Sequence, residues 1–475
     1  MTFIFGATQP MSHTSASAFS RRDFLAHSAL GTAALASTLS PTFAAEPSRK
    51  PRVAAIFTEL RFRSHAYNIL ENFFEPYMFG GELVDPGVEV VSFYADQFPN
   101  RDMARAVSKK FKVPLFDSIG DAMRVGGKKM NVDSVLLIGE HGDYPYNKLG
   151  QKMYPRKRFF DAIVATMKDA DRFVPIFNDK HLSYRWDWAK EMYDTAKRFG
   201  IPFQAGSSVP LAQRMPAIEL PPNADIEEAV SIHGGGFESY DFHGLEVLQS
   251  FVEGRKGGES GVSKVQLLVG DEVERAFKAG RISRDLVDAA MQAETDAKFP
   301  RIERPSTGKA ARKPVAPQKI PNQKRPSAPH ALAIEYEDGF RAAVLKVGSS
   351  GNRWNFACRL KGEKKPQATA LYNGPWGNRC LFKALSHSIQ HLFRTRTEPY
   401  PIERTLLVSG ILEAAVKSFN ADNKSLATPH LEFAYQPIDF SKQRENGGSW
   451  KRITTKTPQP IDFSPGDAAL VKGSK

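Results

Sequence analysis

The chain of 475 residues is longer than one hydrophobic core usually organises, so we expect two domains. Its composition, 41% hydrophobic and 25% charged residues, excludes a disordered chain and a largely membrane-embedded one. The formal net charge of +13 raises the question of nucleic-acid binding, but much of the excess lies in the basic stretch 309–325. No zinc-finger spacing or aromatic RNA-binding motif accompanies it, so we expect a basic linker and no nucleic-acid partner.

The N-terminus carries an export signal. Ser20-Arg21-Arg22-Asp23-Phe24-Leu25 is a twin-arginine motif, and a mildly apolar run over 25–39 follows it. Thr42-Phe43-Ala44 offers small residues for cleavage, which predicts a signal peptide over 1–44 and export through the twin-arginine pathway, for example to the periplasm. The run is shorter than the roughly 20 residues of a spanning helix, so no stable membrane span is expected after cleavage. An uncleaved anchor is the alternative, and Met11 is as good a start as Met1.

Export has two chemical consequences. The twin-arginine pathway carries folded proteins, often with a bound cofactor, which favours a cofactor without naming it. The destination is oxidising, so Cys358 and Cys380 could form a disulfide, although spacing alone does not establish the required geometry.

The first half of the chain alternates short apolar runs with amphipathic stretches. We expect strands at 53–57, 88–94, 135–138, 173–177 and 201–203. We expect helices at 64–77, 102–112, 158–167 and 186–199. This alternation predicts an α/β fold, a Rossmann-like doubly wound parallel sheet over residues 52–215.

The rhythm changes after about Arg214, where a second domain begins. Residues 216–300 start this domain with helices at 242–252, 272–277 and 284–293 and a strand at 265–269. A Pro- and Lys-rich connector is expected at 301–329. Residues 330–475 complete it with a hairpin around Glu337-Asp338-Gly339, strands near 355 and 368, and a helix at 403–418. The second half is therefore predicted to be a C-terminal α/β domain with a largely antiparallel sheet.

Three motifs follow one another in an order that identifies a family. Phe177-Asn178-Asp179-Lys180-His181 ends a strand, and Gly234-Gly235-Gly236 precedes the helix that carries Tyr240-Asp241-Phe242-His243 and Glu246. The chain thereby resembles the glucose–fructose oxidoreductase / inositol dehydrogenase / MocA (Gfo/Idh/MocA) superfamily over about 52–293, and within it a poorly characterised exported branch. The resemblance implies an oxidoreductase-like enzyme acting on a sugar, polyol or related hydroxylated metabolite, with NAD(P) as its cofactor.

The dinucleotide loop departs from the family. The three glycines of the family's Gly-x-Gly-x-x-Gly are replaced by Phe57, Glu59 and Phe62. Glycines there allow a tight turn and a close approach of the pyrophosphate, whereas a bulky ring fills the space and a carboxylate repels phosphate. Conventional NAD(P) binding is therefore in doubt. If a dinucleotide binds, the expected contacts are Thr58, Arg61, Asp96 and Gly139. Asp96 would hold the adenine ribose, although a helix cap or an ordinary loop residue is an open alternative for it.

Two residues match the family's acid–base groups. Lys180 corresponds to the lysine that assists proton transfer at the substrate hydroxyl, and a surface lysine is the alternative. His243 is the second candidate, with Asp241 near the position of the family's aspartate, which here is Ser239. A histidine bonded within the core is the alternative for His243. We expect Lys180 and His243 to face each other across one crevice.

Further polar residues are expected at the same sheet edge, because ligands gather outside the carboxyl ends of parallel strands. Glu246, one helical turn after His243, and Arg404, near the start of the helix at 403–418, are also expected at the substrate, with a structural ion pair as the alternative for Arg404. The candidate substrate-binding residues are Glu140, His141, Asp143, Tyr144, His181, Glu246 and Arg404. Two histidines and a carboxylate can bind a divalent metal, but no spacing such as His-Glu-x-x-His occurs, so no metal is expected.

Two other classes of function remain open. One is a carbohydrate lyase, epimerase or hydrolase on the same scaffold without a redox cofactor, with a metal at the histidine-rich edge as one form of it. The other is a non-catalytic sugar-binding protein. The small-molecule partner would in each case be a sugar- or polyol-like compound, and homo-oligomerisation is expected only by analogy with the family.

Overall fold

The computed structural model describes residues 49–300, 326 and 329–471. The predicted signal peptide and most of the predicted connector therefore lie outside the described residues. Among the helices of the described ranges, none combines the length and the apolar character that crossing a bilayer requires.

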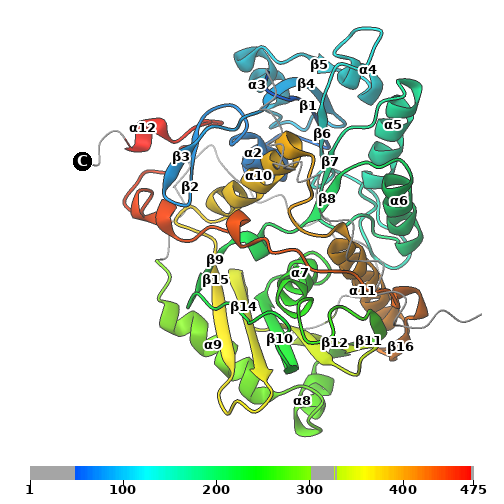
Figure 1. Ribbon diagram of the computed structural model, residues 1–475, viewed down its shortest axis with the longest axis vertical. Coiled ribbons are helices and arrows are strands. Elements are labelled where there is room, and N and C mark those ends of the chain that lie inside the picture. Colours follow the sequence, from blue (N-terminus) through cyan, green and yellow to red (C-terminus); the bar gives the residue numbers. More distant parts are fainter. Residues whose placement is uncertain (1–48, 301–325, 327–328, 472–475) are drawn as a thin grey trace, which may run out of the picture. The chain divides into compact units, whose positions relative to one another are not determined.

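The first sheet has six parallel strands in the order β5-β4-β1-β6-β7-β8 (Figure 1). They are β1 (Arg52–Phe57), β4 (Glu89–Ala95), β5 (Leu115–Phe116), β6 (Ser134–Ile138), β7 (Ile176–Asp179) and β8 (Phe203–Gly206). Counted along the chain within this sheet, the order is 3-2-1-4-5-6, that of a doubly wound dinucleotide-binding sheet. The order reverses between β1 and β6, so ligands of such sheets bind outside the carboxyl ends of these strands.

Both faces of this sheet are covered by helices. Val53, Ala55 and Phe57 of β1 join one core, whereas Ala54 and Ile56 join the other. The helices on the first face are α2 (His65–Leu70) and α3 (Ala104–Phe111). Those on the second are α4 (Ile119–Arg124), α5 (Arg156–Asp169) and α6 (Trp186–Arg198). Burial on both faces explains the uninterrupted apolar runs and confirms the predicted Rossmann-like α/β fold.

The second sheet has eight strands in the order β16-β11-β12-β13-β10-β14-β15-β9. They are β9 (Gln213–Met215), β10 (Ile226–Gly234), β11 (Val262–Val269), β12 (His330–Tyr336), β13 (Arg341–Lys346), β14 (Ser350–Leu360), β15 (Gln367–Tyr372) and β16 (Leu426–Ala427). Within the described residues, β10 and β13 are its parallel pair and the other neighbours are antiparallel. The largely antiparallel second sheet is thus confirmed, as is the hairpin between β12 and β13.

Helices of the second half lie on both faces of this sheet. They are α7 (Asp241–Val252), α8 (Asp271–Lys278), α9 (Arg284–Ala297) and α11 (Ile402–Asn420), whereas α10 (Asn378–Thr395) lies against the first half of the chain. Helices α8 and α9 cover one face, and α7 and α11 lie on the other, between the two sheets (Figure 1). Helix α11 contacts β8 and α6 on one side and α7 and β11 on the other, while α10 packs against α2. The start of α7 is thereby brought to the carboxyl ends of β7 and β8.

Short elements complete the described chain. They are β2 (Tyr77–Phe79), β3 (Glu82–Val84), α12 (Ala468–Val471) and the 3-10 turns η1 (Val209–Leu211), η2 (Pro429–Leu431), η3 (Ser441–Gln443) and η4 (Gly448–Lys451). The two cysteines, Cys358 and Cys380, are separate buried thiols and form no disulfide. Burial raises the pKa of each thiol to about 12, so both are unreactive.

Candidate functional site

The carboxyl ends of β6, β7 and β8 gather polar side chains at one edge of the first sheet. Two further histidines reach this edge from the starts of α2 and α7. We call this group the strand-end cluster, and its members are His65, Glu140, Asp179, Lys180, Ser207 and His243.

Lys180 is the central cation of the cluster. Its side chain is 7% exposed, and its Nζ lies 3.1 Å from Oε1 of Glu140, whose other carboxylate oxygen binds Arg156. Burial acts to raise the pKa of Glu140, but the charges of Lys180 and Arg156 outweigh it and hold this pKa well below its usual value. The backbone of Lys180 has φ +66°, in the region that favours glycine. A buried, paired ammonium on a strained backbone excludes the surface-lysine alternative and is typical of functional positions.

Asp179 holds a histidine that the sequence did not single out. The Nδ1 atom of His65 lies 2.6 Å from Oδ2 of Asp179, and both residues are more than nine-tenths buried. The ring of His65 packs edge-on against His141 at 5.0 Å and Phe382 at 4.8 Å between centroids. Because His65 and Asp179 are 114 positions apart, no local spacing marks them as a pair.

His243 lies beside Lys180. The backbone N–H of Lys180 donates to the carbonyl of Gly206 at 3.2 Å, and the next residue, Ser207, places its Oγ 2.6 Å from Nδ1 of His243. Burial lowers the pKa of His243 well below its usual value, and the nearby charge of Lys180 lowers it further. The structure therefore brings Lys180 and His243 into one cluster.

Glu246 follows His243 by one helical turn and lies on the same side of α7. Its carboxylate accepts hydrogen bonds from Thr405 Oγ1 at 2.8 Å and from the backbone N–H of Ser207 at 3.4 Å. Burial raises the pKa of Glu246 to about 7, so this carboxyl takes up a proton near neutral pH. Glu246 thus supports the segment that holds His243.

His141 and His181 stand next to the cluster as neutral imidazoles. Nδ1 of His141 lies 3.3 Å from Arg61 Nη2, and Nε2 of His181 lies 3.4 Å from Arg156 Nη1. Burial lowers the pKa of both rings well below its usual value, and neighbouring cations lower it further. Among the described residues, His141 Nε2 and His181 Nδ1 are buried without a hydrogen-bond partner.

The loop between β1 and α2 is filled by side chains. Phe57 is fully buried, and Glu59 forms an ion pair with Arg61 at 2.5 Å. Thr58 donates its hydroxyl proton to the carbonyl of Glu140 at 2.6 Å. A dinucleotide held at this loop would meet a buried ring and a carboxylate where its pyrophosphate needs glycine backbone. These residues do not fit the group in its usual position.

Asp96, the expected ribose contact, is fully engaged within the protein. It accepts hydrogen bonds from the hydroxyls of Tyr94 and Tyr144, each at 2.7 Å. Arg158 binds both of its carboxylate oxygens at 2.8–2.9 Å. Tyr144 is therefore also committed to this network, away from the cluster's charged groups.

Gly139 and Asp143 are also engaged in contacts within the protein. A Cβ at Gly139 would lie 2.6 Å from Cγ of Arg156, so the absence of a side chain lets α5 approach the end of β6. The side-chain amide of Gln97 bonds both the N–H and the carbonyl of Asp143, whose own side chain is exposed.

Asp241 belongs to a second buried group, with His233 and His330. Its Oδ1 lies 3.0 Å from Nε2 of His233 and 2.9 Å from Nε2 of His330, and its Oδ2 accepts the backbone N–H of Glu238 at 2.8 Å. Two histidines and a carboxylate this close could hold a metal ion. However, the N–H of Gly235 donates to Nδ1 of His233, so its Nε2 carries the proton that faces Asp241. That bonding fits a hydrogen-bonded lock at the start of α7 better than a metal centre.

Arg404 forms a buried ion pair. Its Nε lies 2.8 Å from Oε2 of Glu253, and its Nη2 binds the other oxygen of the same carboxylate. The guanidinium also packs against the rings of Tyr400 and Phe440. This bidentate pairing is the structural alternative that the sequence left open for Arg404.

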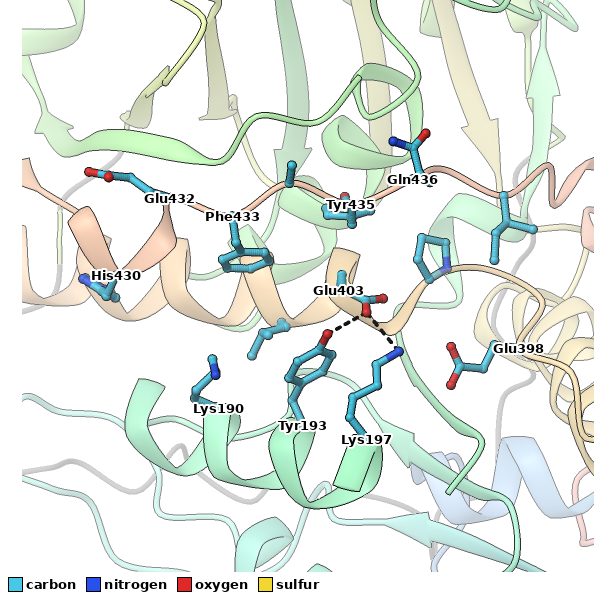
Figure 2. A pocket seen from close by; sticks show the side chains of 14 residues that line it. Lys190, Tyr193, Lys197, Glu398, Glu403, His430, Glu432, Phe433, Tyr435 and Gln436 are labelled. Atoms are coloured by element: carbon cyan, nitrogen blue, oxygen red, sulfur yellow. Dashed lines mark hydrogen bonds and ion pairs between the residues drawn. The ribbon is translucent and has the colours of Figure 1, made fainter. Parts of the chain in front are cut away.

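The groove in Figure 2 lies elsewhere. It has a volume of about 710 Å³ and runs between α6, the start of α11 and the segment 430–438. Glu403 accepts bonds there from Tyr193 at 2.7 Å and Lys197 at 3.0 Å. No residue of the strand-end cluster lines it. We assign the chemistry to the cluster because its buried charges are paired and oriented, whereas the residues of the groove are mostly exposed or half-buried.

Comparisons with known proteins return structures but no sequence family. No family model matches the chain, and no curated protein does. Its similar solved structures include a probable dehydrogenase from Thermotoga maritima, with 11% identity over 80% of this chain and 99% of that one and a TM-score of 0.47. Myo-inositol dehydrogenase from Lactobacillus casei in complex with NAD(H) and myo-inositol shares 14% identity over 82% and 99%, with a TM-score of 0.48. GenD2 from gentamicin A biosynthesis in complex with NAD shares 10% over 80% and 96%, with a TM-score of 0.49.

These structural neighbours are inositol and related dehydrogenases, the type that the sequence resemblance names. Identities of 10–14% and TM-scores below 0.5 transfer none of their activities to this chain.

Proposed function

We propose that this chain is an exported enzyme that transfers protons to and from a hydroxylated small molecule of the sugar or polyol class. Lys180 and His243 are its acid–base groups. The observation that carries the proposal is the buried ammonium of Lys180, bound to Glu140 and placed beside an imidazole that Ser207 holds in position.

The arrangement suits proton transfer. Lysine and histidine side chains act as general acids and bases when they are held within hydrogen-bond reach of the substrate. The neutral imidazole of His243 can donate or accept one hydrogen bond to a hydroxyl group. Together with the ammonium of Lys180 it suits a compound that carries hydroxyl groups.

A redox-neutral reaction is the form of this proposal that we favour. An oxidoreductase on this scaffold would need a nicotinamide dinucleotide, and Phe57, Glu59 and Asp96 do not fit one in the usual position. A lyase, epimerase or hydrolase needs only the acid–base groups that are present. The oxidoreductase implied by the family resemblance is the second candidate and requires a different mode of dinucleotide binding.

Location and substrate class rest on the sequence. The twin-arginine motif at residues 20–25 supports export, and the order of the Lys180 and His243 motifs supports a sugar or polyol substrate. Homo-oligomerisation stays a prediction.

Two measurements test the proposal. The purified exported protein is denatured, and the supernatant is scanned for nicotinamide and for metals. Turnover of a panel of sugars, polyols and sugar acids is then compared for wild type, Lys180→Met and the exposed control Lys168→Met. We expect no nicotinamide and a loss of at least about 10²-fold in turnover for Lys180→Met only. Stoichiometric nicotinamide would overturn the redox-neutral form, and full turnover by folded Lys180→Met would overturn the assignment of Lys180 to the reaction.

A further inference from the structure

His65 has the bonding of an oriented base. Its Nδ1 faces Oδ2 of Asp179 at 2.6 Å, and a carboxylate only accepts hydrogen bonds, so Nδ1 carries the proton. In the neutral ring this leaves a lone pair on Nε2. Among the described residues, Nε2 of His65 has no hydrogen-bond partner. It is also not one of the polar atoms that are buried without a partner, so the protein does not enclose it completely. The basic nitrogen is therefore directed by Asp179 and left open.

His243 has the opposite tautomer. The hydroxyl of Ser207 accepts the backbone N–H of Val209 at 3.0 Å and lies 2.6 Å from Nδ1 of His243. Among the described contacts, His243 Nδ1 is the acceptor within reach of the single proton of this hydroxyl. An unprotonated Nδ1, with the ring proton on Nε2, therefore satisfies both groups. His243 is only partly buried, and its Nε2 is not among the enclosed atoms.

The two rings belong to the same electrostatic neighbourhood. Asp179 and Lys180 are consecutive, and Lys180 is paired through its backbone with Gly206, which precedes Ser207. The chain of contacts thus runs from His65 through Asp179 and Lys180 to Ser207 and His243. The charge of Lys180 acts on the ring of His243.

We propose that His65 and His243 are complementary catalytic groups, with Nε2 of His65 as the general base and Nε2–H of His243 as the general acid. This inference rests on the proposed function and revises one role in it: His65 is the base, and Lys180 acts through its charge. It also names two positioning residues and a reaction class. Asp179 positions His65, and Ser207 positions His243. The substrate is a hydroxylated metabolite with a removable proton on the carbon next to the one that bears its leaving oxygen.

The reaction is an elimination. His65 Nε2 removes the proton from carbon, and the electrons of this C–H bond form a carbon–carbon double bond. The bond between the neighbouring carbon and its oxygen breaks, and that oxygen takes the proton of His243 Nε2, so that water or an alcohol leaves. The Lys180 ammonium stabilises negative charge that develops on a substrate oxygen. No electron leaves the substrate, so no oxidant is required. Proton exchange with solvent afterwards returns both rings to their starting forms.

The first test reads the tautomers without a substrate. Protein with ¹⁵N-labelled histidine is analysed by long-range proton–nitrogen correlation spectra, and the signals are assigned with His65→Gln and His243→Gln. We expect the Nδ1–H form for His65 and the Nε2–H form for His243. Asp179→Asn should shift the His65 signals, and Ser207→Ala should shift those of His243. A cationic or Nε2–H form of His65 in the wild-type protein at neutral pH would overturn the inference.

The second test measures chemistry. Incubation in D₂O with D-gluconate, D-glucuronate, D-glucose and myo-inositol is followed by ¹H NMR for deuterium uptake and for alkene signals. Removal of a general acid or base costs about 10²–10⁴-fold. We expect that loss for His65→Gln and for Asp179→Asn, and none for His391→Gln, a half-exposed histidine on α10.

The outcomes separate the two proposals. Loss of turnover in Lys180→Met with full turnover in His65→Gln would overturn this inference and leave the proposed function standing. Full turnover in both variants would overturn both. If no compound of the panel reacts, the tautomer assignment decides. Circular dichroism of each variant shows that the fold is kept, and Asp179→Asn preserves side-chain size if His65→Gln does not fold.

Discussion

Nζ of Lys180 lies 3.1 Å from Oε1 of Glu140, and the two side chains are 7% and 9% exposed. The second oxygen of Glu140 binds Arg156, whose side chain is 1% exposed. One carboxylate thus serves two buried cations at the carboxyl edge of the sheet. Taking a charge out of water is unfavourable unless it is paired, so this arrangement depends on Glu140.

Replacement of Glu140 by Gln should destabilise the protein strongly. The amide keeps the size of the side chain but leaves the charges of Lys180 and Arg156 uncompensated, which costs about 3–5 kcal/mol for a buried pair. Urea unfolding monitored by circular dichroism measures the change. The matched control is Asp194→Asn in the surface pair with Lys190, for which about 0.5 kcal/mol or less is expected. Equal effects in the two variants would show that Glu140 is not a structural counter-ion.

Glu246→Gln should change how stability depends on pH. Burial raises the pKa of Glu246 to about 7 in the folded protein, against about 4.3 in an unfolded chain. The stability that Glu246 contributes is therefore fully present below pH 4.3 and is lost as the pH rises through 7. Gln does not ionise, so the variant should gain on the wild type between pH 5 and pH 8, on the order of 3 kcal/mol at most.

Unfolding free energies at several pH values check this, with the exposed Glu337→Gln as control. A difference between Glu246→Gln and wild type that is constant from pH 5 to pH 8 would contradict the raised pKa.

The first sheet was predictable because its strands are buried on both faces. β1 and β6 are short, nearly uninterrupted apolar runs, and their length favours a strand over a helix. The prediction places both within one residue of their observed bounds. β10 escaped prediction, because Glu227, Glu228, Ser231 and His233 interrupt its apolar pattern. α10 escaped for a similar reason: Arg379, Lys383 and Gln390 are buried in it and bond to partners far along the chain.

Helix α2 shows a different limit. The apolar pattern predicts a helix over 64–77, but the helix ends at Leu70 and the chain reaches β2 at Tyr77. Tyr77 is fully buried through contacts with α10, including a hydrogen bond from its hydroxyl to Gln390 at 2.7 Å. Tertiary packing therefore places Tyr77 in a strand, although the local apolar periodicity assigns it to the helix.

The candidate site could be predicted only for residues whose place in the fold follows from the order of the strands along the chain. Lys180 and Glu140 each follow a parallel strand, so their meeting at one sheet edge follows from the topology. The His65–Asp179 bond and the Asp241 lock join distant segments through side chains, and a single sequence contains no signal for either pair.

Asp96→Ala should reduce stability and leave dinucleotide binding unaffected. The substitution removes the acceptor of Tyr94, Tyr144 and Arg158, and partly buried groups left without partners cost about 1–3 kcal/mol. Thermal unfolding measures the loss, and fluorescence titration with NADH tests binding for the variant and the wild type. If wild type binds NADH and Asp96→Ala does not, Asp96 is a ribose contact and our interpretation of this network is wrong.

The hydrogen-bonded group of Asp241, His233 and His330 at the start of α7 allows a test of whether these residues bind a metal ion. Asp241 accepts Nε2 of His233 and of His330 at 3.0 and 2.9 Å, and ring protons in these bonds would exclude an ion from the same space. Burial acts to raise the pKa of Asp241, but its two histidine partners outweigh this and keep the pKa below its usual value. Dialysis against EDTA should therefore leave the thermal midpoint unchanged.

Asp241→Asn should lower the free energy of unfolding by about 2–4 kcal/mol, because the amide cannot accept all three hydrogen bonds that the carboxylate receives. Asp225→Asn, in an exposed pair with Lys256, is the control and should change stability by less than about 1 kcal/mol. Elemental analysis of the purified protein completes the experiment. One equivalent of a transition metal, released by EDTA together with a fall in the thermal midpoint, would mean that the histidine nitrogens are ligands, because a bound ion stabilises the folded state by mass action.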